Sequence, residues 1–404
     1  MGALQDFSAL NRSRAGLAEE GVYFQIIYTA DSMANLAGGI RPGVDYSGRL
    51  DSIFDIYFGR MFGKDAAQGL LADDRAHIDI LTIQGAGITG NYVGSLASIS
   101  GIEASPTVRL FEAWWEHVFG PWSLRFGQMG IDSEFFGSVV AGQFSDNTFS
   151  WPVVMSADLP DGGAASTLST PAVRLKYVDP GQTFEWQAAA FNGDPTQPGP
   201  GQAQRRNPHG LDFRLRDGAF LVTDLKINAP FLPGASLKLG GWGHTGRFND
   251  FRYNATGGRL AVDGGAPKVH CGDYGFYGVV DAPVPGVNNL FFLRALVALG
   301  RVNLVSEQID AGWCARAYSR TRRLTRSGSL FPTRASRMRR AASTTTRLPP
   351  GRAWFAAISR PCSMPIMPSR SSPAAPSSPM SNMSYIRAAA PIQAACAGSP
   401  THLS

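Results

Sequence analysis

Three observations in the sequence predict an all-β protein, an antiparallel transmembrane β-barrel. Short runs that alternate apolar and polar residues recur from residue 21 to residue 312, separated by clusters of Gly, Pro, Asn and Asp. The 46 Gly and 27 Pro residues in a chain of 404 favour many turns. No run of 18 apolar residues exists, which excludes helical membrane spans, but a membrane strand needs only about 9 to 11 alternating residues. The region holds about 12 strands.

Residues 45–58 contain the first clear strand. Tyr46, Leu50 and Phe54 share one face of the extended chain, because successive side chains of a strand point to opposite faces. Arg49 and Asp51 share the other face. One face is therefore apolar and the other is charged.

Residues 109–132, RLFEAWWEHVFGPWSLRFGQMGID, predict a hairpin. Alternation places Trp122 and Phe126 on one side of the second strand and Arg125 on the other. The turn falls at residues 120–121, since Gly supplies unusual backbone angles and Pro cannot extend a central ladder. The tryptophans of this stretch need an apolar surrounding, either lipid or a protein core.

Later runs continue the same pattern. Residues 172–178 and 183–190 alternate, and the turn sequence DPGQ joins them at residues 179–182. Residues 219–227 and 290–299 set aliphatic side chains opposite charged ones. Each run predicts a further strand of the same sheet.

Aromatic residues near the strand ends bear on what surrounds the apolar face. A soluble β-sandwich also alternates, with apolar residues directed to a core and charges directed to water. A membrane barrel directs its apolar face to lipid and carries aromatic girdles at both interfaces. The residues that suit such girdles are Tyr46, Phe58, Trp115, Phe119, Trp122 and Tyr177. They favour the barrel, and a soluble secreted β-sandwich that binds sugars stays open as an alternative.

Charge divides the chain into unlike parts. Residues 313–404 carry 14 Arg, no Lys and none of the 31 acidic residues, which leaves residues 1–312 net acidic. The formal net charge of +6 therefore comes from the end of the chain, and we expect no nucleic-acid partner. We predict a lead-in at residues 1–20, an incomplete barrel at 21–312 and a disordered tail rich in Arg, Ala, Ser and Pro at 313–404.

Other motifs give one weaker alternative. GAGITG at residues 85–90 matches the G-x-G-x-x-G loop of nucleotide-binding oxidoreductases. Asp79 interrupts the strand before it, and glycines run through the helix that should follow, so the match is weak. No G-x-S-x-G occurs and the six His residues lack metal-ligand spacing. We expect no enzyme, no catalytic residue, no cofactor and no metal.

Several segments resemble the carbohydrate-selective porins of the OprB type. The most specific are YTADSMANLAGG at residues 28–39, RLFEAWWE at residues 109–116 and FNGDP at residues 191–195, and further likeness lies in LPGASLKLGGWGHTGRFND and ALGRVNLVSEQIDAG. The likeness covers roughly residues 10–312. It implies an outer-membrane barrel of about 16 strands through which sugars diffuse passively.

The polar strand faces carry the residue types that a channel for neutral sugars needs. Such a channel offers hydrogen-bond donors and acceptors without a strong field of one sign. Arg presents five donors in a planar fork, and carboxylates accept. We therefore predict that the lining includes Arg49, Arg109, Glu112, Glu116, Arg125, Arg174 and Glu185. Trp114 has the parity of Glu112 and Glu116, and its ring would offer an apolar plate to a sugar.

Residues 313–404 are interpreted as the product of a frameshift in a GC-rich gene. Basic tails usually mix Lys with Arg, whereas this segment holds Arg alone. The codons permitted for Trp313–Arg326 also permit a shifted frame that reads VRAGLFPNAPADT, which resembles porin turn sequence. We therefore expect a damaged porin, truncated before its closing strands, whose sheet stays open.

The resemblance also implies a location and partners. It points to the outer membrane of a Gram-negative bacterium, with neutral sugars and outer-membrane lipid as partners. The first residues, MGALQDFSALNRSR, lack the basic start and apolar run of a secretory signal. Trimers are common among such barrels, so a homotrimer is a candidate assembly.

Overall fold

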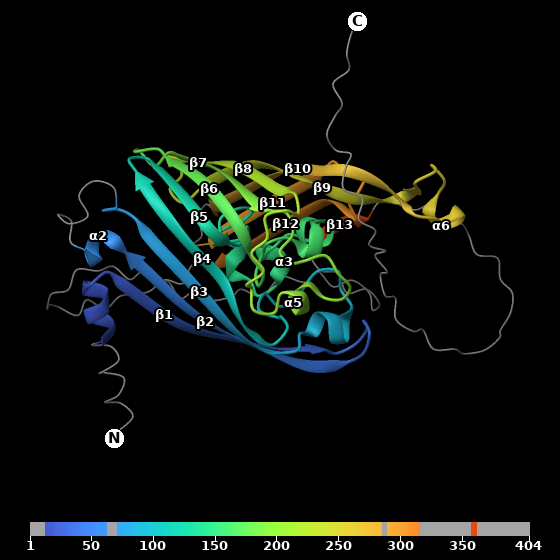
Figure 1. Cartoon of the computed structure of the whole chain (residues 1–404), viewed down its shortest axis with the longest axis horizontal. Coiled ribbons are helices and arrows are strands. Elements are labelled where there is room, and N and C mark those ends of the chain that lie inside the picture. Colours follow the sequence, from blue (N-terminus) through green and yellow to red (C-terminus); the bar gives the residue numbers. More distant parts are fainter. Residues whose placement is uncertain (1–12, 63–70, 285–288, 316–356, 362–404) are drawn as a thin grey trace, which may run out of the picture.

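The strands pair in chain order into one antiparallel sheet that curves around a concave inner side (Figure 1). The computed structural model describes residues 13–62, 71–284, 289–315 and 357–361. The strands are β1 (Val22–Asn35), β2 (Gly43–Tyr57), β3 (Arg75–Gly85), β4 (Thr107–Phe119), β5 (Trp122–Met129), β6 (Thr170–Val178), β7 (Phe184–Asn192), β8 (Ala219–Asn228), β9 (Ser236–Asn254), β10 (Pro267–Pro283), β11 (Asn289–Ala298), β12 (Val305–Ala315) and β13 (Ala357–Pro361). Among these strands no pairing joins β1 to β12 or β13, so the sheet is open.

The predicted all-β, antiparallel and incomplete barrel is confirmed as far as β12. This strand ends at Ala315, slightly later than the predicted end of the barrel at residue 312. β13 pairs with β12, with Ile309 opposite Ile358, although we expected no strand in residues 313–404. The rest of that predicted disordered tail lies outside the described residues, as do most of residues 1–20.

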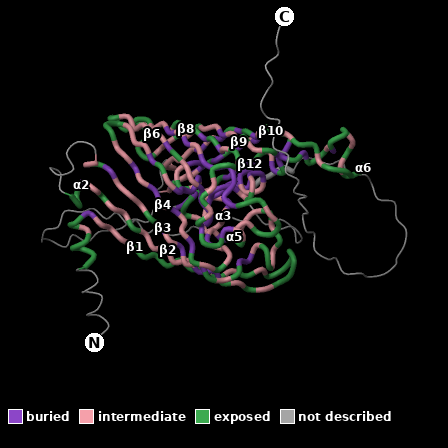
Figure 2. The backbone as a smooth tube through the Cα atoms, viewed as in Figure 1, coloured by how far each residue is buried: buried purple, intermediate pink, exposed green. Residues whose placement is uncertain are grey.

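The two faces of the sheet follow the predicted alternation (Figure 2). On β5, Phe126 on the convex face is 49% exposed, whereas its neighbour Arg125 on the concave face is 6% exposed. On β8, Leu221 is likewise exposed and Val222 is buried. The soluble β-sandwich is therefore wrong as a description of this chain, because a sandwich would bury its outward apolar residues beneath a second sheet.

Connections differ in length between the two ends of the sheet. At one end, β4 and β5 are joined only by Gly120 and Pro121, as predicted, and Phe119 pairs with Trp122 across the turn. Gly120 has a φ of +60°, which suits glycine. The same end holds the predicted DPGQ turn between β6 and β7. The other end carries long connections, which include residues 86–106, 130–169 and 193–218. Transmembrane barrels have this asymmetry of short and long connections.

An aromatic cluster lies on the convex face beside the short turns. The ring of Trp122 is 4.8 Å from that of Tyr177 and 6.1 Å from that of Trp186, measured between centroids. Tyr177 also stacks on Phe184. Trp and Tyr at the end of an outward apolar face are typical of a membrane interface.

Residues 130–169 fold back into the concave side of the sheet and form its core, as Figure 1 shows around α3. This inward segment has no strand, and its helices are η2 (Ala141–Gln143), α3 (Asn147–Ser150), α4 (Val153–Asp158) and η3 (Pro160–Gly162). Phe136, Val154 and Met155 are fully buried within it. They belong to one cluster with the inner faces of β7 to β12.

The remaining helices are short. They include α2 (Phe58–Met61), η1 (Thr89–Val93), α5 (Ala203–Arg206) and α6 (Leu260–Asp263), and residues 13–19 are helical as well. In the part of the chain that the structure describes, no helix is long and apolar enough to cross a bilayer.

Candidate functional site

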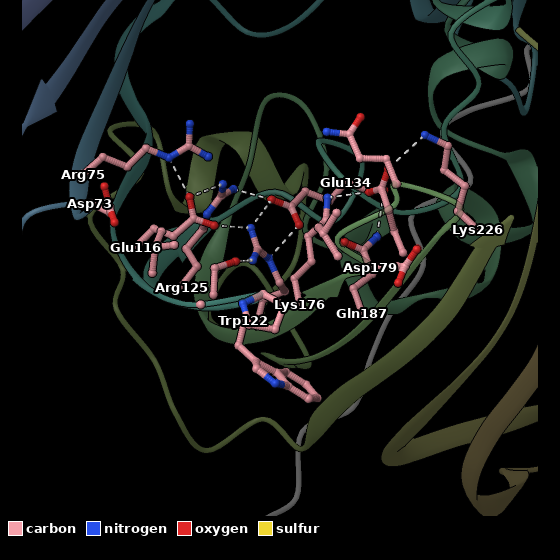
Figure 3. A pocket seen from close by; sticks show the side chains of 18 of the residues that line it. Asp73, Arg75, Glu116, Trp122, Arg125, Glu134, Lys176, Asp179, Gln187 and Lys226 are labelled. Atoms are coloured by element: carbon pink, nitrogen blue, oxygen red, sulfur yellow. Dashed lines mark hydrogen bonds and ion pairs between the residues drawn. The ribbon is translucent and has the colours of Figure 1, made fainter. Parts of the chain in front are cut away.

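A cavity of about 1100 Å³ lies on the concave side, near the short turns (Figure 3). The inner faces of β3 to β9 line it together with Glu134 from the inward segment. Its cationic side chains are Arg75, Arg125, Arg174, Lys176, Lys226 and Lys238, and its anionic ones are Asp73, Glu116, Glu134, Asp179, Glu185 and Asp224. Six of each sign give a charged wall with no net charge.

Four of these side chains form a row across adjacent strands. Arg75 of β3 pairs in register with Glu116 of β4, Glu116 pairs with Arg125 of β5, and Arg125 pairs with Arg174 of β6. Glu116 accepts from Arg75 Nε at 2.6 Å, from Arg174 Nη2 at 2.8 Å and from Arg125 Nη2 at 3.3 Å. One buried carboxylate thus contacts three guanidinium groups.

Glu134 supplies the second carboxylate of this row. Like charges directly opposite each other on neighbouring strands repel, and Arg125 and Arg174 are such a pair. The Glu134 carboxylate contacts Arg174 Nε at 2.8 Å and also forms an ion pair with Arg125. Burial alone would raise the pKa of Glu134, but Arg125 and Arg174 outweigh burial and hold this pKa below its usual value. Glu134 is therefore an anion that offsets the two arginines.

The Trp114 ring packs against Arg125 of this row. The His77 ring of β3 stacks on the Trp114 ring, with the two centroids 4.7 Å apart. The Arg125 guanidinium of β5 also lies over the Trp114 ring, 3.6 Å from its centroid. Trp114 Nε1 donates to Glu112 Oε2 at 3.0 Å. Trp114 is only 8% exposed, so its ring is covered by packing contacts and little of it could contact a solute.

A second group of charges lies nearer to the turns. Glu185 of β7 contacts Lys176 Nζ of β6 at 2.8 Å and Lys226 Nζ of β8 at 3.2 Å. Lys238 of β9 lies 3.9 Å from Asp224, which also accepts from the Tyr277 hydroxyl at 2.6 Å. Each lysine of the wall therefore has a carboxylate neighbour.

The structure brings together four of the predicted site residues and leaves four outside the cavity lining. Glu116, Arg125, Arg174 and Glu185 line the cavity. Arg49 instead pairs with Asp51 at 3.0 Å and donates to Ser166, while Glu112 accepts from the backbone N–H of Gly130. Trp114 and Arg109 are the other two.

Arg109 lies in a fully buried position. It donates to Thr167 Oγ1 at 2.6 Å, to the carbonyl of Pro208 at 3.0 Å and to the carbonyl of Gln204 at 3.1 Å. It thereby ties β4 to two of the long connections. Arg109 and Glu112 are three positions apart, so a regular strand would place them on opposite faces. A register shift between β3 and β4 lies between the two positions, and both side chains are buried. Alternation alone would therefore not place both residues in the lining.

Several lining residues escaped the sequence prediction. Arg75, Lys176, Lys226 and Lys238 all lie on inward-facing strand positions, so alternation alone could have found them. Glu134 lies in a connection without any periodicity. Nothing in the local sequence marks Glu134 as a partner of the arginines.

The nucleotide-binding alternative is wrong. Gly85 ends the antiparallel strand β3, and the five-residue η1 begins at Thr89, whereas a dinucleotide site needs a parallel strand and a longer helix. The backbone N–H of Gly87 donates to Asp45 at 2.8 Å, and that of Thr89 donates to Glu103 at 3.2 Å. Carboxylates therefore occupy the donors that a phosphate would need.

Comparisons with known proteins agree with this geometry. A family model described as carbohydrate-selective porin, OprB family, matches residues 43–323. The high-pH structure of Pseudomonas putida OprB is 19% identical, with a TM-score of 0.66, and the alignment covers 76% of this chain and 74% of that chain. The low-pH structure of Pseudomonas putida OprB is 14% identical over 76% and 75% of the two chains, with a TM-score of 0.43. A search of curated proteins gives no match.

An antiparallel sheet with an apolar convex face, long connections at one end and a charged lumen defines the porin class. The chain belongs to the OprB family of carbohydrate-selective porins. The predicted resemblance is therefore confirmed.

Proposed function

We propose that this porin, when its barrel is complete, lets neutral carbohydrates diffuse passively across the outer membrane of a Gram-negative bacterium, with the cavity near the short turns as part of the passage. The observation that carries this proposal is the balance of six cationic and six anionic side chains in its wall. A wall with no net charge gives no strong preference to ions of one sign, while its charged groups still form hydrogen bonds to hydroxyl groups.

The row of Arg75, Glu116, Arg125 and Arg174 is the proposed sugar-binding part of the wall. Neighbouring guanidinium groups offer donors at the spacing of adjacent strands, and vicinal sugar hydroxyls can accept from one and donate to a carboxylate. Glu185 between two lysines provides a second such set. A homotrimer and the location in the outer membrane remain predictions from the family.

Conductance measurements test this function. The chain with its reading frame restored beyond Gly312, so that the closing strands are supplied, would be folded in detergent and inserted into planar lipid bilayers. Glucose and maltose would be added while the ion current is recorded. We expect both sugars to reduce the current. The variant Arg174→Gln should weaken the block about tenfold, because a hydrogen bond to a charged group is lost. Arg49→Gln is the matched control, since Arg49 lies on an inner face but outside the cavity lining. The absence of any sugar block, or equal losses in both variants, would contradict the proposal.

We also propose that a frameshift produced the Arg-rich end of the chain and thereby damaged the porin. The support is the 14 Arg without any acid in residues 313–404. Because the family match continues to residue 323, the nucleotide sequence should be read from the codon of Gly312 to beyond that position. An undisturbed frame with matching relatives would rule the frameshift out.

A further inference from the structure

The turn that carries Glu134 is held by side chains from three strands. Gln187 Nε2 donates to the Glu134 carbonyl at 3.2 Å, and Lys238 Nζ donates to the same carbonyl at 3.3 Å and to that of Gly137 at 3.4 Å. Arg294 Nη1 donates to the Phe136 carbonyl at 3.1 Å. The backbone of residues 134–137 is thus fixed from β7, β9 and β11.

Arg294 is the most deeply placed of these three side chains. It is 0% exposed and does not line the cavity, in contrast to Gln187 and Lys238. It donates from Nε and Nη2 to Asp310 Oδ2 at 2.9 and 2.7 Å, and from Nη2 to the Thr148 carbonyl at 2.5 Å. Arg294 therefore joins β11 and β12 to two points of the inward segment, and no solute in the cavity would touch it.

Phe136 shows that this turn needs external support. Its φ is +61°, an unfavourable value for a residue with a Cβ. Such a conformation persists only where the surroundings fix it, and such residues often lie at functional sites. The Phe136 ring is fully buried, with its centroid 4.2 Å from that of Tyr277, and the bond from Arg294 fixes its carbonyl.

We propose that Arg294 is a positioning residue for the channel, which holds the Phe136 turn and thereby sets the Glu134 carboxylate between Arg125 and Arg174. Release of the turn would withdraw this carboxylate and leave the two arginines under-compensated. The wall would then become net cationic at its centre. The effect on ions depends only on the porin class, while the effect on sugars rests on the function proposed above.

A charge-neutral pair of substitutions separates positioning from charge. Arg294→Gln with Asp310→Asn removes one positive and one negative buried charge together, so no lone buried charge remains. We expect the reversal potential in a salt gradient to shift toward anion selectivity, as it should in Glu134→Gln. Adding Glu134→Gln to the pair should give no further shift, because both changes act through one carboxylate. An unchanged selectivity, or an additive shift in the triple variant, would overturn the proposal.

Hydrogen exchange provides a second test that needs only the detergent-folded chain. The amides of residues 134–137 should exchange about 10- to 100-fold faster in the Arg294 and Asp310 pair variant, the range expected for a lost hydrogen bond to a charged group. Arg109→Gln is the matched control, because Arg109 is also fully buried and holds the same inward segment at Thr167. It should accelerate exchange near residue 167 only. Equal acceleration at residues 134–137 in both variants would assign Arg294 a general structural role and overturn the proposal.

These outcomes are distinguishable from failure of the proposed function. If the unsubstituted protein shows no sugar block, the sugar function fails, yet selectivity and exchange still decide whether Arg294 positions Glu134. If sugar block is present and the pair variant weakens it as much as Glu134→Gln does, both proposals gain support.

Discussion

The concave face of the sheet differs between its first and second halves. On β3 to β6 the inner face carries charges, which include Arg75, Glu116 and Arg174, and it borders the cavity. On β8 to β11 the same face carries charges only near the cavity, at residues such as Lys238, and elsewhere it carries large apolar side chains, which include Phe220 and Trp242, packed beneath the inward segment. Both halves alternate with the same period and present apolar residues on the convex side.

Alternation therefore determines which face of the sheet a side chain lies on, but not whether water or protein surrounds it on that face. In the first half the inner face meets water, so burying a charge there requires an ion-pair network. In the second half the inward segment excludes water over much of the inner face, so apolar contacts dominate there. The ion pair of Arg294 and Asp310 is fully buried in this half. The inward segment therefore decides which half of the lumen can serve as passage.

The largest expected effect comes from the apolar half. Phe220→Ala removes a ring that is 2% exposed and stacks on Trp242, so it should lower the free energy of unfolding by about 3–5 kcal/mol. Phe126→Ala is the control, because Phe126 lies on the convex face and is 49% exposed, and it should change this free energy by about 0.5 kcal/mol or less. Urea unfolding in detergent micelles, followed by tryptophan fluorescence, measures both. Similar losses in the two variants would mean that the inward segment does not pack as described.

The sequence predicted the sheet, its faces and its tight turns because these are local properties. The two-residue turn at Gly120 and Pro121 and the inward direction of Arg125 follow from turn chemistry and period alone. The row from Arg75 to Arg174 also depends on strand register, which alternation leaves undetermined by shifts of two residues.

The inward segment could not be predicted, and it changes where some of the predicted site residues lie. Residues 130–169 have no regular period, so the sequence shows neither their path nor the contacts of Glu134. For the same reason the sequence predicts Arg109 in the lining, whereas its side chain is fully buried and donates to Thr167 of this segment. Long-range contacts of irregular segments depend on the whole fold rather than on local pattern.

An intermediate effect is expected in the charged half. Glu116→Gln keeps the side-chain shape but removes the charge that three arginines share, so the free energy of unfolding should fall by about 2–3 kcal/mol. Glu185→Gln is the matched control, since Glu185 is more exposed and contacts two lysines, and its loss should be about 1 kcal/mol or less. The same urea titration reports both values. A larger loss of unfolding free energy for Glu185→Gln would show that the charges near the turns, and not the row from Arg75 to Arg174, are the stabilising network.

The smallest effect concerns pH and the inward segment itself. Burial raises the pKa of Asp158 in α4 to about 7, against the backbone N–H groups of Leu304 and Val305, which lower it. The folded state therefore binds the proton of the Asp158 carboxyl more tightly than the unfolded chain, in which the pKa of Asp is about 3.9. The stability that this proton contributes is fully present below pH 3.9 and is lost as the pH rises through 7. Between pH 6 and pH 7 this loss should be about 1 kcal/mol. Asp158→Asn should remove this part of the pH dependence of the free energy of unfolding. Burial and the nearby Asp161 also raise the pKa of Asp194 to about 7, so the pH dependence that comes from Asp194 should remain in this variant. Urea unfolding at the two pH values gives the comparison, and equal slopes in Asp158→Asn and the unsubstituted protein would show that Asp158 is already ionised at pH 6.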